Sequence, residues 1–313
     1  MPEPAGSPGA PDAPASLVRT APRPIGSGLR VAPLAFGCWR LVAMTPAEAR
    51  ARLEAALDAG MNLVDTADVY GLDWGGAGFG AAEELLGRVL ADAPGLRARM
   101  VLATKGGIRP PIPYDASARA LREACEASLR RLGVEQVDLY QVHRPDLFTH
   151  PAEVAEALAA LRDAGKIALA GVSNHTPAQT EALRAHLPFP LSTSQPELSA
   201  VQLGPLRDGT LDACMQHGTV PLAWSPLAGG RLATGEGVRP ELLAVLDRLA
   251  AREGVDRAAI ATAFVLAHPA APVAIVGTTN VERLRAAPRA LGVALAREDV
   301  YAIVQASEGV PLP

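Results

Sequence analysis

Eight short apolar runs recur along the chain, and this rhythm constrains the fold more than any other feature. Segments with the spacing of amphipathic helices lie between most of these runs. Strands that alternate with helices predict parallel βαβ units. Eight units favour a closed (β/α)8 barrel over an open doubly wound sheet, since no GxGxxG follows the first run. The runs are Leu34–Gly37, Asn62–Asp65, Val101–Thr104, Asp138–Val142, Leu169–Val172, Leu191–Ser194, Val220–Trp224 and Val273–Val276.

Several helix boundaries are written into the sequence. Thr45 and Glu48 form a capping box around Pro46, which predicts that a helix begins there. Gly133 follows a periodic apolar stretch and is expected to end a second helix. Thr176, which stands before a proline, opens another helix. The elements between the apolar runs are therefore helices rather than loops.

The chain is expected to form a single folded domain behind a tail. Residues 1–17 are rich in Pro, Ala, Gly and Ser and predict a disordered tail. Residues 18–313 form the barrel domain, and the stretch around Pro24–Gly28 suggests a β-hairpin at its start. The N-terminus has neither the basic stretch nor the apolar core of a secretory signal, so we expect a cytoplasmic protein.

Charge and cysteine content exclude several classes of function. The formal net charge is −4, with 29 basic and 33 acidic side chains, which gives no electrostatic basis for binding nucleic acid or an anionic membrane. No run of about 18 apolar residues predicts a membrane span. The three cysteines, Cys38, Cys125 and Cys214, are an odd number at wide spacing, which favours neither a disulfide framework nor a metal site.

Polar residues follow almost every predicted strand. The active site of a (β/α)8 enzyme lies at the C-terminal ends of its strands. Asp65 ends the second strand and Tyr70 follows it, while Lys105 and His143 follow the third and fourth strands. We therefore expect these four side chains to converge on one mouth of the barrel.

This set of side chains suits the reduction of a carbonyl group. A lysine held by an aspartate is a fixed positive charge, which we expect to lower the pKa of a nearby tyrosine from about 10. Tyr70 can then donate a proton to a carbonyl oxygen, while His143 orients that oxygen or assists the transfer. The hydride must come from a cofactor, since no side chain supplies one.

These motifs occur along the chain in the order typical of the aldo/keto reductase family, which the sequence resembles from about residue 18 to 305. The segment from Trp224 to Arg231 is most similar to a branch of bacterial oxidoreductases in that family. The order of motifs makes the resemblance specific. The matching pieces are Gly37-Cys38-Trp39, the run Asp65 to Gly71, Glu83 with Leu86-Gly87, Lys105, His143, Gly171 to Asn174, Gln195, Trp224 to Leu227, and Val276-Gly277-Thr278 with Arg283.

The resemblance implies an NADPH-dependent reduction of an aldehyde or ketone, with reverse oxidation also possible. It implies a catalytic tetrad of Asp65, Tyr70, Lys105 and His143. It implies that Ser173, Asn174 and Gln195 hold the nicotinamide carboxamide. It places Trp224, Ser225, Pro226, Leu227, Gly229 and Arg231 at the pyrophosphate, and Gly277, Thr278, Thr279 and Arg283 at the adenosine 2′-phosphate.

Two features bear on cofactor and substrate. Many family members carry a cation directly after the last strand, where it pairs with the 2′-phosphate of NADPH. Here the first cation is Arg283, so the resemblance leaves NADH open as the cofactor. Trp39 and Trp74 are candidate walls of the substrate pocket. The glycine-rich segment 71–80 is either a flexible loop or a lid over the substrate.

Two other functions stay open alongside carbonyl reduction. The barrel could bind or sense NADPH without catalysis, although a pure binding protein has no need of a proton donor. Less consistent with the sequence is a Schiff-base lyase that uses Lys105 as nucleophile, because Asp65 would hold that lysine charged.

Overall fold

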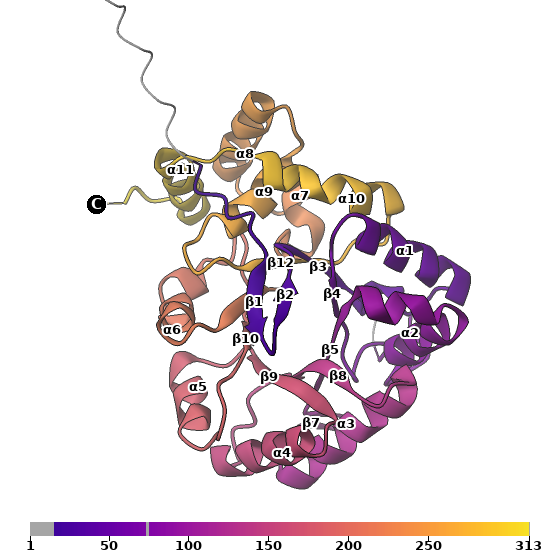
Figure 1. The fold of residues 1–313 in the computed structure, drawn as a ribbon. Coiled ribbons are helices and arrows are strands. Elements are labelled where there is room, and N and C mark those ends of the chain that lie inside the picture. Colours follow the sequence, from indigo (N-terminus) through magenta and orange to yellow (C-terminus); the bar gives the residue numbers. More distant parts are fainter. Residues whose placement is uncertain (1–15, 73–74, 313) are drawn as a thin grey trace, which may run out of the picture.

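The computed structural model describes residues 16–72 and 75–312, which form a (β/α)8 barrel as predicted (Figure 1). Its eight strands are all parallel, and β9 pairs with β10 to close the ring, which rules out the open sheet. In the order of the chain the barrel strands are β3 (Leu34–Gly37), β4 (Leu63–Asp65), β5 (Val101–Gly106), β8 (Val137–Val142), β9 (Ile167–Ser173), β10 (Thr193–Gln195), β11 (Val220–Ala223) and β12 (Val273–Val276).

Helices surround the barrel as an outer layer (Figure 1). They are α1 (Pro46–Asp58), α2 (Ala81–Asp92), α3 (Ala118–Leu132), α4 (Pro151–Asp163), α5 (Pro177–Arg184), α6 (Thr210–His217), α7 (Arg231–Thr234), α8 (Pro240–Glu253), α9 (Arg257–Leu266), α10 (Val281–Ala286) and α11 (Arg297–Glu308). Short 3-10 helices lie at Trp39–Leu41, Pro94–Arg99, Gly204–Leu206, Ala228–Gly230 and Ala287–Gly292.

The predicted helix ends are confirmed. Thr45 caps α1 in a complete capping box with Glu48. Thr176 caps α5 in the same way, with Gln179 as its reciprocal partner. Gly133 ends α3 with a φ of 66°, a left-handed conformation that glycine adopts without steric cost. Because these signals act between near neighbours in sequence, they specify helix ends without help from the barrel.

Alternation along the strands divides the apolar residues into two layers. On β5, Val101 and Ala103 pack in the barrel interior, while Leu102 packs outward against the helices. On β8, Leu139 faces the interior and Tyr140 packs outward. This period of two carries on to the ends of the strands, where the next inward positions are Lys105 and Gln141. The interior is therefore apolar below and polar at the mouth.

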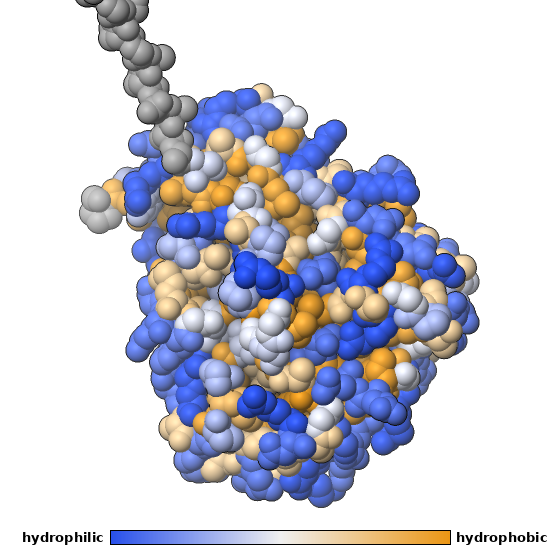
Figure 2. Space-filling view, in the orientation of Figure 1, coloured by the Kyte–Doolittle hydropathy of each residue, from blue (hydrophilic) through white to orange (hydrophobic). Residues whose placement is uncertain are grey.

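A β-hairpin closes the N-terminal end of the barrel, as the sequence suggested. It consists of β1 (Arg23–Gly26) and β2 (Leu29–Val31), which lie in front of the barrel in Figure 1. Ile25 and Val31 belong to the interior apolar cluster. Figure 2 shows this face, with polar residues around its rim and apolar side chains between them near the hairpin. The opposite, C-terminal end is left for the active site.

The described chain starts within the predicted tail. Leu17 N–H donates to Leu295 O at 2.8 Å, so the chain joins the domain from its first described residues. Positions 1–15 of the predicted tail lie outside the described residues. A second hairpin, β6 (Ile108–Arg109) with β7 (Ile112–Tyr114), follows β5 at the C-terminal end. Within residues 16–72 and 75–312 no helix is long and apolar enough to cross a membrane, and no cluster of side chains suits a metal ion.

Candidate active site

The four side chains of the expected tetrad lie together at the C-terminal mouth of the barrel. Lys105 Nζ is 2.6 Å from Asp65 Oδ2 and also donates to the carbonyl of Thr66 at 2.9 Å. The same ammonium group lies 5.1 Å from the centre of the Tyr70 ring. The rings of Tyr70 and His143 meet edge to face, with their centres 5.8 Å apart. The four groups are thus within reach of a single small substrate.

The backbone holds Tyr70 in a tight turn between β4 and α2. Tyr70 N–H donates to Ala67 O, and the Tyr70 carbonyl accepts from Ala82 N–H at the start of α2. Gly71 follows with a φ of 114°, and a Cβ there would lie 2.5 Å from Gly78 O. A glycine is therefore required directly after the tyrosine, both for its conformation and for space.

Lys105 is a buried, charged group. Its side chain has no exposed area, and burial alone would lower its pKa. The charge of Asp65, the Tyr70 phenol and the hydrogen bonds to both outweigh that effect and raise the pKa of Lys105 above its ordinary value. Lys105 therefore carries a fixed positive charge across the pH range in which enzymes work.

The pKa of Tyr70 differs from the sequence expectation. Burial raises the pKa of this phenol above 10, while the charge of Lys105 lowers it and Asp65 raises it again. The effect of Lys105 has the expected sign, but desolvation of the phenolate outweighs it. The prediction of a net lowering of the pKa was wrong, because the sequence does not show how far the fold buries the phenol. Tyr70 is protonated at neutral pH, as a proton donor must be.

His143 is neutral at neutral pH. Burial, then the positive charges of Lys105 and Arg144, hold its pKa well below 6.5. Among the described residues, its Nδ1 atom finds no hydrogen-bond partner. A neutral imidazole beside a protonated phenol can orient a carbonyl oxygen without adding another charge to the site.

A second buried polar cluster lies behind the tetrad, between β5 and the helices. Glu83, on α2, accepts a hydrogen bond from Thr104 and pairs with Arg131 at 2.7 Å. Burial and the nearby charge of Glu83 raise the pKa of Asp68 well above its ordinary value. Asp68 N–H donates to the Lys105 carbonyl, so this cluster braces the strand that carries Lys105.

The residues expected at the nicotinamide form one hydrogen-bonded group beside the tetrad. Asn174 Nδ2 donates to Ser173 Oγ at 2.8 Å, and Ser173 Oγ donates to Gln195 O at 3.0 Å. Trp224 Nε1 donates to Asn174 Oδ1 at 2.9 Å. Asn174 has a φ of 58°, the left-handed region that asparagine tolerates best after glycine. Residues from three strand ends thus meet at one place.

Gln141 also belongs to this site, although its role is not visible in the sequence. Gln141 Nε2 lies 3.4 Å from Asp65 Oδ1, and Gln195 Nε2 donates to the same oxygen at 3.1 Å. The only signal in the sequence was its place at the end of a strand, two residues before His143. The partners of Gln141 are set by the register of the barrel.

The segment after β11, expected at the pyrophosphate, turns tightly through several residues in the left-handed conformation. Ser225, Gly229 and Gly230 have φ values of 55°, 73° and 109°, and Ser225 Oγ accepts from Gly229 N–H at 2.9 Å. A Cβ at either glycine would meet no atom within 4 Å. Within the same run Pro226 is buried, Leu227 packs against the core, and Arg231 is exposed with its Nε bound to Ala228 O.

The residues expected at the adenosine end lie between β12 and α10. Thr278 Oγ1 accepts from Asn280 N–H, and Asn280 caps α10 by accepting from the backbone N–H of Arg283, whose side chain is exposed. Gly277 has open space around its Cβ position. Arg52, on α1, donates to the Thr279 carbonyl at 3.1 Å. The fold thus brings a cation to this loop from α1, more than 200 residues away in sequence, where no pattern around the last strand indicates it.

The candidate walls of the substrate pocket are only partly described. Trp39 is 40% exposed, and its ring lies 6.5 Å from that of Tyr70, centre to centre. Trp74 falls outside the described residues, and so does part of the segment that was expected to be a loop or a lid.

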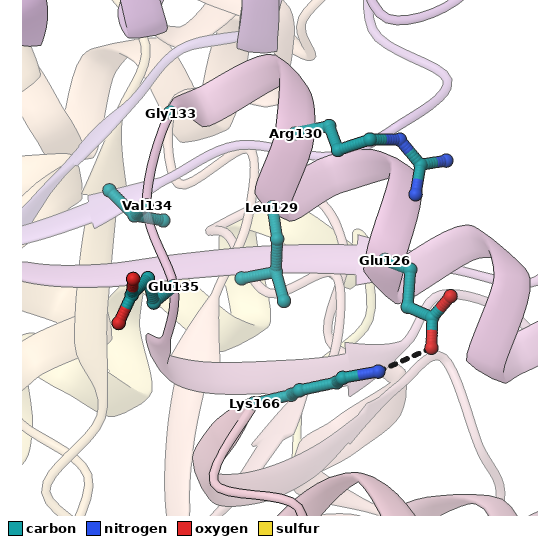
Figure 3. A pocket seen from close by; sticks show the side chains of 7 residues that line it. All are labelled: Glu126, Leu129, Arg130, Gly133, Val134, Glu135 and Lys166. Carbon is teal, nitrogen blue, oxygen red and sulfur yellow. Dashed lines mark hydrogen bonds and ion pairs between the residues drawn. The ribbon is translucent and has the colours of Figure 1, made fainter.

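A surface hollow of about 540 Å³ lies away from this chemistry (Figure 3). It is lined by the end of α3, the turn before β8, and Lys166, which pairs with Glu126 across it. Because Lys166 immediately precedes β9, the hollow lies at the N-terminal side of the strands, opposite the tetrad. It plays no part in the site described here.

Comparison with known proteins agrees with the geometry. The aldo/keto reductase family model matches residues 33–308. A 6-dehydroglucose reductase of Novosphingobium aromaticivorans is 49% identical over 290 residues, which cover 92% of this chain and 95% of that protein. A 6-dehydroglucose reductase of Agrobacterium fabrum is 36% identical over 282 residues, with 86% and 92% covered.

A solved structure shows the same likeness. The glycerol dehydrogenase of Gluconobacter oxydans superimposes with a TM-score of 0.79 at 28% identity, with 95% of this chain and 96% of that chain covered. The ordered strand ends, the matching family model and the relatives along nearly the whole length agree. The chain therefore belongs to the aldo/keto reductase family and is an oxidoreductase.

Proposed function

We propose that this protein uses NADPH to reduce the aldehyde of a sugar such as 6-dehydroglucose to the alcohol, with Tyr70 as the proton donor. The observation that carries the proposal is the buried Lys105–Asp65 pair directly beside the Tyr70 phenol and the neutral His143. The substrate class comes from the two reductases to which the chain is 49% and 36% identical.

The residues around the mouth fit a nicotinamide dinucleotide. Ser173, Asn174 and Gln195 offer hydroxyl and amide groups at the depth of the tetrad, which suits a carboxamide. Gly229 and Gly230 leave open space where a diphosphate can approach the backbone. When bound, a reduced nicotinamide supplies the hydride that the side chains cannot.

The chain's own residues handle the proton and the orientation of the carbonyl. Tyr70 holds a proton at its phenol oxygen, since burial raises its pKa. Lys105 stabilises the phenolate that remains after the proton has moved to the carbonyl oxygen. Asp65 keeps Lys105 charged and in place. His143, being neutral, can hydrogen-bond the carbonyl oxygen before the transfer.

Arg144 supports a substrate with many hydroxyl groups. It directly follows His143, and its guanidinium lies 6.0 Å from the centre of the Trp224 ring. A guanidinium offers five hydrogen-bond donors, which suits the oxygen atoms of a sugar better than an aliphatic chain.

The two alternative functions receive less support. A Schiff-base lyase needs a lysine that loses its proton readily, but the surroundings raise the pKa of Lys105. Borohydride trapping with a carbonyl substrate is therefore expected to leave Lys105 unlabelled. A sensor that only binds NADPH has no use for the Tyr70 phenol. A turnover assay separates the sensor from the reductase.

The test is a turnover assay that follows nicotinamide absorbance. We expect kcat/KM for 6-dehydroglucose to exceed that for an unbranched aliphatic aldehyde by at least about tenfold, since the sugar hydroxyls add hydrogen bonds in the transition state. Tyr70→Phe serves as the inactive control. No turnover across a broad carbonyl panel would reject catalysis and favour the sensor. Equal kcat/KM values for both aldehydes would reject the sugar as substrate class.

A further inference from the structure

Three neighbouring strands carry a polar layer across the barrel interior. Gln141 on β8 is paired in register with Gly171 on β9, and Gly171 is paired with Thr193 on β10. The side chains of Gln141 and Thr193 are fully buried. Residues that are paired across parallel strands point to the same side, so these three positions all face the lumen.

Gly171 makes the contact between its two neighbours possible. A Cβ at position 171 would lie 2.1 Å from Thr193 Oγ1 and 3.2 Å from Gln141 Cγ. No side chain therefore fits between them. With the glycine in place, Gln141 and Thr193 meet across β9.

Thr193 sets the orientation of the Gln141 amide. Thr193 Oγ1 donates to Gln141 Oε1 at 3.1 Å. The amide nitrogen of Gln141 is thereby turned to Asp65 Oδ1, which it reaches at 3.4 Å. An ionised carboxylate only accepts hydrogen bonds, so the amide nitrogen of Gln141, and not its oxygen, has to face Asp65. In this orientation the amide oxygen accepts from Thr193 and the amide nitrogen donates to Asp65.

Asp65 is consequently held at both of its oxygens. Lys105 binds Oδ2, while Gln195 and Gln141 approach Oδ1. A buried ion pair is stable only when its remaining lone pairs also find donors. The two glutamines differ in their access to the cofactor. Gln195 belongs to the group proposed for the nicotinamide, whereas Gln141 lies deeper in the lumen of the barrel.

We propose that Gln141 is a positioning residue that keeps the Asp65 carboxylate aimed at Lys105 when Gln195 binds the nicotinamide. This inference rests on the proposed function, because it assigns Gln195 to the cofactor. Thr193 and Gly171 serve the same purpose one step further away, by orienting Gln141 and by leaving it room. Without Gln141, Gln195 has to hold Asp65 alone and is less available to the cofactor.

The first experiment measures binding rather than activity. Gln141→Met keeps the length of the side chain and removes its amide. Quenching of tryptophan fluorescence measures the affinity for NADPH. We expect the variant to bind NADPH about fivefold to tenfold more weakly than the wild-type protein, which corresponds to the loss of one hydrogen bond to a charged group. Adenosine 2′,5′-bisphosphate, which lacks the nicotinamide, is expected to bind equally well to both proteins. Gln136→Met, at an exposed glutamine that bonds Gly165 O, is the matched control.

The second experiment separates positioning from folding. In Gln141→Met we expect kcat to fall about tenfold with KM for the carbonyl unchanged. Thr193→Val, which removes only the hydroxyl, is expected to lower kcat by a smaller factor, again with KM for the carbonyl unchanged. The double variant should be no worse than Gln141→Met alone.

The outcomes are distinguishable from failure of the proposed function. Failure of the wild-type protein to bind NADPH would remove the proposed function and this inference with it. Tight wild-type binding with an unchanged NADPH affinity in Gln141→Met would overturn this inference alone. Equal weakening of NADPH and adenosine 2′,5′-bisphosphate, or strictly additive effects of the two substitutions, would also overturn it. Should Gln141→Met fail to fold, Thr193→Val carries the same test.

Discussion

Lys105 Nζ lies 2.6 Å from Asp65 Oδ2, although 40 residues separate the two in sequence. The contact follows from the register of β4 and β5, in which Asp65 is opposite Ala103. Lys105 stands two residues further along, on the same face of its strand, and its long side chain reaches back to the carboxylate. The pair is closed to water, which is why its charges act strongly on Tyr70 and His143.

Replacement of Tyr70 tests the proton donor. Tyr70→Phe removes one oxygen and is expected to lower kcat by about 10²-fold to 10⁴-fold, the usual contribution of a positioned proton donor. NADPH affinity should change little, since the ring remains. Steady-state kinetics and fluorescence titration give the two quantities. Tyr301→Phe, at a half-exposed tyrosine on α11, is the control, and retention of turnover in Tyr70→Phe would refute the assignment.

The choice between NADPH and NADH tests the adenosine end of the site. Arg283→Ala is expected to weaken NADPH binding by about tenfold and NADH binding much less, because only NADPH carries the 2′-phosphate that a guanidinium binds. Calorimetric titration measures both affinities. Arg285→Ala, two residues away where the arginine pairs with Glu282, should change neither. Equal losses for the two cofactors would show that Arg283 does not contact the 2′-phosphate.

The low pKa of His143 predicts a specific pH dependence of stability. The unfolded chain binds a proton at this histidine below pH 6.5, whereas the folded protein does not until the pH is well below that value. Stability is therefore lost as the pH falls below 6.5, by up to about 1.4 kcal/mol per pH unit for this one proton.

The corresponding variant is His143→Gln, which has no proton to gain. Urea unfolding between neutral pH and about pH 5 is expected to show a smaller loss of stability in the variant than in the wild-type protein. Parallel pH dependences of the two proteins would mean that His143 is already charged in the folded state.

Gly87 tests the packing of α2 against α3. A Cβ at this position would lie 2.1 Å from the Arg131 carbonyl oxygen and 3.1 Å from Leu132 C, both backbone atoms. Alanine favours a helix over glycine by about 1 kcal/mol, yet Gly87→Ala is expected to lower the free energy of unfolding by about 2 kcal/mol because the helices must separate. Gly95→Ala, where a Cβ meets nothing within 4 Å, should leave it unchanged within about 0.5 kcal/mol. Equal effects would contradict close helix packing as the cause.

The sequence by itself determined the elements and which residues share the mouth of the barrel. The capping box at Thr45, the helix start at Thr176 and the eight apolar runs appear in the structure where they were expected, to within one or two residues. Asp65, Lys105 and His143 could be assigned to one site because parallel strands end on one side. These signals act between near neighbours or repeat along the chain, so they can be read without a fold.

Tertiary structure alone decided the contacts across strands and the balance of charge and burial. The direction of the Tyr70 pKa depends on water exclusion by residues far apart in sequence, and the sequence expectation was wrong for that reason. The bonds of Gln141 to Thr193 and Asp65, and of Arg52 to Thr279, join residues 52 to 227 positions apart. Only the register of the closed barrel and the packing of helices around it bring such side chains together, because nothing local in the sequence records them.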